Sequence, residues 1–243
     1  MILVLKNMLK PRAVSEISKR FSIFFIFVSL TFLIIGLYVG IFISPPDYQQ
    51  GDSVRIMYVH VPAAWMSLIC YAFMSLSSAL GFIFKIPTLH LFSKSAAPIG
   101  ACFTLIALLS GVLWGKPTWG VWWVWDARLT SVLVLFFLYM SYLIIWEVIY
   151  DRDYAIKISS TIAILGFINL PIIKFSVDWW NTLHQKSSIG FLEAPSIHYS
   201  MLIPLCIVFL GFLFYFLSVF LIRFRKEFLN IKIENLHLNL SKE

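Results

Sequence analysis

The chain has 243 residues, of which 60% are hydrophobic and 13% are charged, and its formal net charge is +7. Soluble domains contain about 45–50% apolar and about 25% charged residues, and a globule of this size has too little interior to bury so many apolar side chains. The composition therefore excludes an ordinary soluble protein and favours an integral membrane protein. The basic residues lie beside apolar runs, where they orient a membrane chain, so the charge is no evidence for a nucleic-acid partner.

Six stretches are long and apolar enough to cross the hydrocarbon core, which takes about 20 residues of helix. In chain order they are 21–43, 61–84, 96–114, 129–150, 158–176 and 199–222. The first is longer than the apolar part of a signal peptide and has no cleavage site after it, so we expect it to be retained as a span. The sequence thus predicts an all-α fold, a single polytopic membrane domain over residues 1–243 with six transmembrane helices.

The distribution of basic residues predicts the orientation of the spans. With six spans both termini lie on one side of the membrane. That side carries 14 of the 19 Lys and Arg, in the segments 1–20, 85–95, 151–157 and 223–243. The positive-inside rule therefore predicts both termini in the cytoplasm or the mitochondrial matrix. The opposite, outer side carries the segments 44–60, 115–128 and 177–198.

Catalytic and nucleotide-binding patterns are missing from the sequence. Gly115-Lys116 is followed by Pro117 instead of Ser or Thr, so there is no Walker motif, and any ATP hydrolysis belongs to another subunit. The three cysteines lie singly in apolar runs, which argues against a disulfide framework, a zinc site or covalent haem attachment. We therefore expect a protein that is not an enzyme, and the spans show no polar pathway across the bilayer.

Tryptophan is concentrated on the outer side in residues 114–128, which we call the Trp segment. Five of the nine tryptophans lie there: Trp114, Trp119, Trp122, Trp123 and Trp125. Gly115, Pro117 and Gly120 are expected to prevent one continuous helix, and the glycines to let a flat ligand approach the backbone. Trp also favours the membrane interface, so an aromatic belt is the alternative. A belt would occupy all helix ends, whereas this cluster occupies one loop, which favours a surface for a large planar apolar ligand.

Two of the five histidines, His60 and His184, bracket the Trp segment on the outer side. Pro62 suits the first turn of a helix, so we expect His60 near a helix start and facing the outer surface. Neutral imidazole is a common iron ligand, and haem iron takes axial nitrogens from two faces. The pair therefore predicts haem coordination, with ordinary interfacial hydrogen bonding as the alternative for each residue. His198, at the outer end of the sixth span, is a reserve axial ligand.

Haem also accounts for the residues around these histidines. Its ring is flat and apolar, which suits contact with tryptophan, and its two propionates are anionic. Arg55 and Arg128 lie beside His60 and the Trp segment, and guanidinium groups bind carboxylates in a bidentate manner. The alternative for each arginine is a lipid head group or a salt bridge, such as one between Asp126 and Arg128. Asp126 is expected to shape the loop through hydrogen bonds.

These motifs resemble a known family. Residues 114–130, WGKPTWGVWWVWDARLT, resemble the tryptophan-rich WWD signature of haem-handling membrane proteins. The segments RIMYVHVPAAWMS around His60 and SVDWWNTLHQ around His184 are similar to those of one branch, the haem exporter protein C (CcmC) family of system I cytochrome c maturation. The likeness covers about residues 45–200, and the tails carry none of it.

The resemblance implies a six-span protein that presents transiently bound haem b at the outer face. It implies His60 and His184 as the axial ligands of the iron, and the five tryptophans of the Trp segment together with Asp126 as the haem surface. It further implies delivery to the haem chaperone CcmE and association with the ABC transporter subunits CcmA and CcmB and the small subunit CcmD. The implied location is a bacterial inner membrane, with the mitochondrial inner membrane as the alternative.

Two other functions compete with this interpretation. One is a membrane electron-transfer subunit with permanently bound b-type haem, but such subunits place their histidines within the spans, often for two haems, whereas here the candidates lie at one boundary. The other is a scaffold whose tryptophans anchor it at the interface, which predicts a colourless purified protein.

Overall fold

The computed structural model describes residues 11–184 and 196–240, and within these ranges every regular element is a helix. The long helices are α2 (Pro11–Tyr38), α3 (Met57–Phe84), α4 (Pro87–Trp119), α5 (Ala127–Val148), α6 (Arg152–Gly166), α7 (Asn169–Trp179) and α8 (Tyr199–Leu240). A π-helical turn, η1 (Val39–Ile43), extends α2, and a 3-10 helix, η2 (Asp52–Ile56), leads into α3.

Six helical stretches are long and apolar enough to cross a membrane, which confirms the all-α, six-helix prediction. They are Ser15–Ile43, Asp52–Phe84, Pro87–Trp119, Ala127–Val148, Arg152–Trp179 and Tyr199–Glu234. Each predicted span lies inside one of them, except that 129–150 passes the end of α5 by two residues. Ile149 is already extended there, and the Asp151 side chain accepts a hydrogen bond from the Tyr154 amide at 2.9 Å to begin α6.

The fifth span was expected to be continuous, but the structure divides it into α6 and α7. The break falls at Phe167 and Ile168, whose amides bond three residues back, to Ile164 and Leu165. Pro171 explains the position, because a proline ring clashes with the carbonyl four residues before it and removes one helical hydrogen bond.

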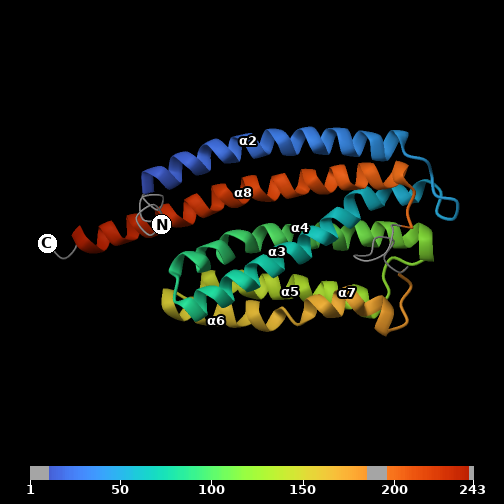
Figure 1. The fold of residues 1–243 in the computed structure, drawn as a ribbon. Helices are drawn as coiled ribbons and strands as arrows, with labels where there is room; N and C mark the ends of the chain where they lie inside the picture. Colours follow the sequence, from blue (N-terminus) through green and yellow to red (C-terminus); the bar gives the residue numbers. More distant parts are fainter. Residues whose placement is uncertain (1–10, 185–195, 241–243) are drawn as a thin grey trace.

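The helices lie in layers in Figure 1. The pair α2 and α8 lies along one side of the bundle, α3 and α4 occupy the middle, and α5, α6 and α7 lie on the other side. The start of α2 and the end of α8 lie at the same end of the molecule. This arrangement agrees with an even number of crossings.

Small residues allow α2 and α8 to approach closely. A Cβ on Gly36 would lie 2.8 Å from a methyl group of Val208, and one on Gly211 would lie 2.7 Å from Leu33. Ser29 donates a hydrogen bond to the Gly211 carbonyl at 2.8 Å. Close backbone contact and interhelical hydrogen bonds are the interactions that associate helices in lipid, where both surfaces are equally apolar.

The main core lies between α3, α4, α5 and α6, and it contains more polar groups than the spans led us to expect. The buried Tyr139 hydroxyl donates to the Ser67 carbonyl at 2.8 Å, and the Ser75 hydroxyl donates to the Ala163 carbonyl at 2.6 Å. These hydroxyls join helices through backbone acceptors, which satisfies them locally. They therefore stabilise the packing and do not form an open polar path.

Candidate functional site

The Trp segment begins as the last turns of α4 and continues as the connection to α5. The prediction that Gly115 and Pro117 interrupt the helix was wrong, because α4 runs to Trp119. Near a helix end, only one hydrogen bond is lost to Pro117. The helix stops at Gly120, which has φ 78°, a conformation that favours glycine, and whose amide bonds back to the Lys116 carbonyl.

His60 lies in the first turn of α3 and faces α4, which corrects the prediction that it faces the outer surface. Helix α3 begins at Met57, so the His60 side chain points between the two helices. Its Nδ1 lies 3.1 Å from the Ser110 hydroxyl, and a Cβ on Gly111 would lie 3.0 Å from its Cε1. The glycine thus makes room for the imidazole beside α4.

The contact with Ser110 assigns the tautomer of His60. The Ser110 hydroxyl donates its own proton to the Ile106 carbonyl at 2.6 Å. Its oxygen therefore accepts a hydrogen bond from Nδ1–H of His60. The proton then resides on Nδ1, so that Nε2 is the ring nitrogen that carries the lone pair.

Trp114 lies between His60 and the connection that precedes α3. Its ring meets the His60 imidazole edge-on, with centroids 5.5 Å apart. Its indole Nε1 donates a hydrogen bond to the Gln50 side-chain oxygen at 2.9 Å. The ring also packs against a buried cluster that contains Met57 and Tyr58. Trp114 is thus a fixed, half-buried part of the wall beside His60.

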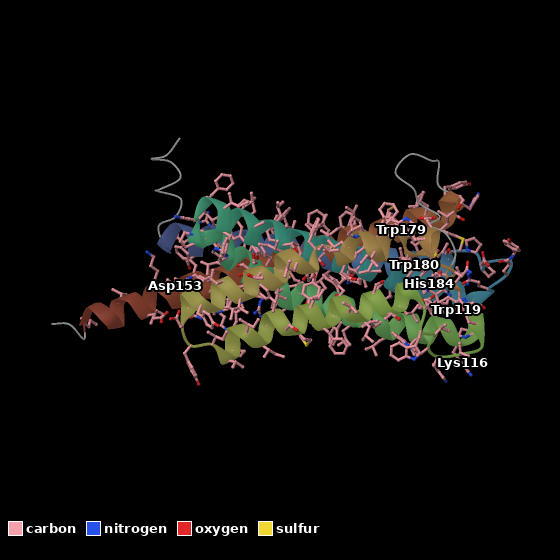
Figure 2. The ribbon with its side chains drawn as sticks, turned by 90° about the horizontal axis from the view of Figure 1, so that it is seen from below. Lys116, Trp119, Asp153, Trp179, Trp180 and His184 are labelled. Atoms are coloured by element: carbon pink, nitrogen blue, oxygen red, sulfur yellow. The ribbon has the colours of Figure 1, made fainter. Side chains whose placement is uncertain are left out.

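His184 follows α7 and returns to the Trp segment. Its ring meets Trp119 edge-on, with centroids 4.8 Å apart, and Figure 2 shows the two residues side by side. Its Nδ1 lies 3.4 Å from Oδ2 of Asp126, a long contact, while the side chain is 21% exposed. The other oxygen of Asp126 accepts the Leu129 amide at 2.8 Å and so begins α5. A carboxylate on Nδ1 again favours the tautomer in which Nε2 carries the lone pair.

The structure brings the two histidines to the same end of the bundle. His60 contacts Trp114 and His184 contacts Trp119, both on the last two turns of α4. The two imidazoles are close enough to interact electrostatically, and Arg128 interacts with both. Arg128 also donates a hydrogen bond to the Ile173 carbonyl at 3.4 Å.

The two predicted arginines have different surroundings. Arg128 lies near Asp126 and Asp178 as well as near the histidines. Arg55 lies on η2, where its Nε is 3.0 Å from a carboxylate oxygen of Asp52. Arg128 is therefore near both imidazoles, and Arg55 lies next to the start of α3.

The other three tryptophans lie in the connection between α4 and α5. Trp125 is 74% exposed and Trp122 is 54% exposed, and the Lys116 ammonium lies 5.6 Å from the Trp122 ring centroid. Trp123 contacts Trp125 edge-on. Its indole nitrogen is buried, and no acceptor for it lies among the residues that the structure describes. An unpaired buried donor is costly, so an external acceptor would satisfy it.

A cavity of about 390 Å³ opens beside the exposed tryptophans. Its lining comes from the Trp segment and from the residues before His184: Val124, Trp125, Asp126, Asn181, Thr182 and Leu183. The Trp segment and the segment after α7 thus border a space next to His184 in the sequence.

Two residues at this end were not identified from the sequence, and His198 has a contact that was not expected. Ser110 and Gln50 contact His60 and Trp114, but they lie 50 and 64 residues away in the sequence, and no local pattern marks them. His198 uses Nδ1 to accept the Ser200 amide at 3.3 Å and thereby begins α8. The reserve role of His198 as an axial ligand stays a prediction.

The titration of His184 provides a test of this geometry. Burial, reinforced by the positive charge of Arg128, lowers the pKa of His184 from its ordinary value of 6.5, while Asp126 opposes the shift. The folded protein therefore binds this proton less readily than the unfolded chain, and the stability linked to a neutral His184 is lost as the pH falls through the ordinary value. We expect His184 to titrate with a midpoint below its ordinary value. The midpoint should fall further in Asp126→Asn, which removes the negative charge that favours the protonated imidazole but can still cap the helix. Histidine NMR signals measure both, and a midpoint at or above the ordinary value contradicts the assignment.

Comparison with known proteins identifies the family. Residues 4–239 match the family described as Heme exporter protein C, CcmC, so the expectation that the likeness is confined to about residues 45–200 was wrong. The chain is 45% identical over 220 residues to the Heme exporter protein C of Haemophilus influenzae, covering 90% of this chain and 89% of that protein. The chain belongs to the CcmC family. It is also 45% identical over 197 residues to the Escherichia coli K12 Heme exporter protein C, covering 81% and 79% of the two chains.

The CcmC family includes organellar relatives. The chain is 53% identical over 179 residues to a cytochrome c biosynthesis ccmC-like mitochondrial protein of Marchantia polymorpha, covering 74% of this chain and 75% of that protein. With its six membrane-length helices, this CcmC family member is a multi-pass inner-membrane protein.

Proposed function

We propose that the protein binds haem b at the outer end of its helical bundle and delivers it to the haem chaperone CcmE for cytochrome c maturation. The observation that carries the proposal is the pair His60 and His184. Each has its Nδ1 held by an acceptor, so each presents Nε2 at the same end of the bundle. Membership of the CcmC family supports haem as the cargo.

The two imidazoles provide the ligands that haem iron prefers. A neutral imidazole binds iron through the nitrogen that carries the lone pair, and an acceptor on the other nitrogen fixes the ring orientation and raises its basicity. Ser110 supplies that acceptor for His60, and Asp126 supplies it for His184. Both side chains thereby become positioning residues for the axial ligands.

The Trp segment provides contact area for the porphyrin and donors for its acidic groups. Trp122 and Trp125 are more than half exposed, and their rings suit edge or face contact with a flat apolar ligand. The unpaired indole nitrogen of Trp123 and the guanidinium of Arg128 suit the propionates, and Arg55 lies at the rim for the same role. The orphaned donor therefore fits an amphipathic, acid-bearing cargo.

The mechanism that follows is transfer without a chemical reaction. The protein holds the iron with two imidazoles and leaves one edge of the haem accessible. The acceptor CcmE competes for an axial position and removes the haem by that edge. ATP hydrolysis by CcmA, bound with CcmB and the small subunit CcmD in one complex, drives release of the loaded acceptor. This chain contributes binding and orientation.

The proposed orientation puts the histidines on the periplasmic side and both termini in the cytoplasm, or the matrix in an organelle. The six-span architecture and the excess of basic residues at the terminal end of the bundle support it. Acquisition of haem at the outer face is consistent with the locally satisfied hydroxyls of the core.

The test is an absorption spectrum of the purified full-length protein with and without CcmE. We expect a Soret band with a bis-histidine signature that decreases as the chaperone acquires haem. A colourless protein supports the scaffold alternative. A haem that CcmE never removes, and that turns over with quinone, supports an electron-transfer subunit.

Removing the exposed or histidine-contacting tryptophans tests the haem surface. Trp119→Ala removes the ring beside His184, and Trp125→Ala removes the most exposed indole of the Trp segment. Each is expected to reduce haem accumulation about tenfold while membrane insertion is preserved, since aromatic contacts of this size contribute about 1 kcal/mol or more. Retained haem per protein is the measurement. Tyr48→Ala, at an aromatic residue 90% exposed in the connection before α3, is the control. Chaperone loading at the parental rate in both Trp variants contradicts the role of the Trp segment.

A further inference from the structure

A cavity of about 520 Å³ lies at the end of the bundle opposite the histidines. It is formed where α3 ends, where α4 and α6 begin, and by the last third of α8. Figure 2 shows Asp153, one of its lining residues, at the opposite end from Trp119 and His184. The cavity is therefore separate from the site described above.

The lining of this cavity combines basic and apolar side chains. Lys85, Arg152 and Lys232 come from three different helices or their ends, and Asp153 is the acidic residue among the lining residues. Leu91 and Phe228 belong to a buried apolar cluster beneath them, and Ile156 and Ile231 extend the apolar wall. Such a lining fits an anionic head group carried on an apolar body.

Lys85 lies at a backbone position in the left-handed region, where glycine would be less strained than lysine. Lys85 ends α3 with φ 54°, and it is the non-glycine residue with positive φ in the part of the chain that the structure describes. Glycine is the usual residue at such a helix end. A lysine at this position adds a positive charge to the cavity wall, beside those of Arg152 and Lys232.

His90 forms part of the cavity wall, but its imidazole is already occupied. Its Nδ1 lies 3.2 Å from the Ser160 hydroxyl. A Cβ on Gly81 would lie 2.9 Å from Nε2 of His90, so the ring is held against α3. The cavity therefore offers cationic groups to an anion and no open imidazole to an iron atom.

We propose that this cavity binds the phosphate-bearing head group of an anionic phospholipid. The charges lie at the membrane-surface end of the helices, and basic pockets between transmembrane helices on the cytoplasmic side attract anionic head groups. The apolar wall of Phe228 and Ile231 accommodates the acyl end of the lipid. Haem propionates share the anionic chemistry, so the experiment separates the two ligands.

The first experiment measures lipid retention by the full-length protein in nanodiscs that contain phosphatidylglycerol, with native mass spectrometry as the readout. The variant carries Lys85→Gln, Arg152→Gln and Lys232→Gln. Its control carries Lys19→Gln, Lys157→Gln and Lys226→Gln, which removes the same charge from exposed positions outside the cavity. We expect retention to fall about tenfold or more in the cavity variant and to stay near the wild-type level in the control, because each lysine or arginine near the surface contributes about fivefold.

A gain-of-binding variant keeps the test informative if the triple variant fails to fold. Asp153→Asn removes the negative charge that lines the cavity, so it is expected to increase phosphatidylglycerol retention, an outcome that misfolding does not produce. Phosphatidylcholine, which carries phosphate without net charge, is expected to be retained weakly by every variant. Equal retention of both lipids, or equal retention in the cavity and control variants, overturns the proposal.

A haem arm distinguishes this site from the proposed function. Haemin is added to His60→Ala, His184→Ala protein with and without the three cavity substitutions. We expect residual haem absorbance to be the same in both. Residual absorbance that disappears with the cavity substitutions would assign the cavity to haem and overturn the lipid proposal. Because lipid retention is measured without haem, failure of the proposed function leaves this result unchanged.

Discussion

Replacing either His60 or His184 by alanine is expected to remove the bis-histidine haem spectrum. Each single change is also expected to reduce haem transfer to CcmE by about tenfold or more. Loss of a metal ligand costs more than loss of the residue that hydrogen-bonds the ligand, and that loss alone costs about 10–100-fold in affinity. The proposed ligation rests on the contacts of the two Nδ1 atoms, with Ser110 for His60 and with Asp126 for His184. Soret absorbance per protein and the rate of CcmE loading measure the effect.

The control for these variants is His198→Ala, which removes an imidazole from the same end of the protein. His198 accepts the Ser200 amide at the start of α8, so its loss is expected to leave the haem spectrum unchanged.

Ser110→Ala is expected to retain haem with an altered reduction potential. Ser110→Thr is expected to restore the parental potential, since a hydroxyl at this position orients His60. Normal absorbance and normal transfer in both His60→Ala and His184→Ala would refute the proposed ligation.

Placing a side chain at Gly100 is expected to have the largest effect on folding. Gly100 on α4 faces the buried Tyr139 ring of α5, and a Cβ there would collide with the tyrosine hydroxyl. That hydroxyl donates to the Ser67 carbonyl of α3 at 2.8 Å, so moving it breaks a contact among three helices. We expect Gly100→Val to destabilise the protein by about 3 kcal/mol or more, as overpacking and a broken buried hydrogen bond combine. The yield of monodisperse protein and its Tm measure the loss.

Two further variants separate this steric effect from a general sensitivity of α4. Cys102→Val, two residues along the same helix and exposed, is expected to change the Tm little. Gly100→Ala combined with Tyr139→Leu is expected to recover much of the stability lost by Gly100→Ala alone, because the smaller side chain makes room. A Gly100→Val protein as stable as the parent would show that α4 and α5 are not in close contact at this point.

The six-helix architecture can be predicted from the sequence because a membrane span depends on the length of an apolar run along the chain. A run of about 20 apolar residues has to cross the bilayer as a helix, whatever its neighbours are. The break between α6 and α7 was missed because the range 158–176 was predicted from its hydrophobicity alone, whereas the ring of Pro171 clashes with the carbonyl of Phe167. The continuation of α4 through Pro117 was missed for the opposite reason, because a proline near the end of a helix removes little.

The site was harder to predict from the sequence than the fold, because its contacts join residues that are far apart in the chain. Residue type alone singled out His60 and His184, but the direction of His60 depends on where α3 begins and on the space left by Gly111. Ser110 looks like any hydroxyl in an apolar helix until α3 packs against α4 and brings it to His60. Asp126 was expected to form local hydrogen bonds, and it begins α5 while also reaching His184 across 58 residues.

The two imidazoles belong to different kinds of backbone segment. His60 is part of a helix that crosses the membrane, whereas His184 belongs to the short stretch that follows α7. Shifting His60 requires the repacking of α3 against α4, whereas the contacts described for the His184 ring are a long one to Asp126 and an edge-on one with Trp119. For a haem bound as proposed, we therefore expect the ligand His184 to be exchanged first, so that the departing haem is held by His60 until the acceptor has replaced its other ligand.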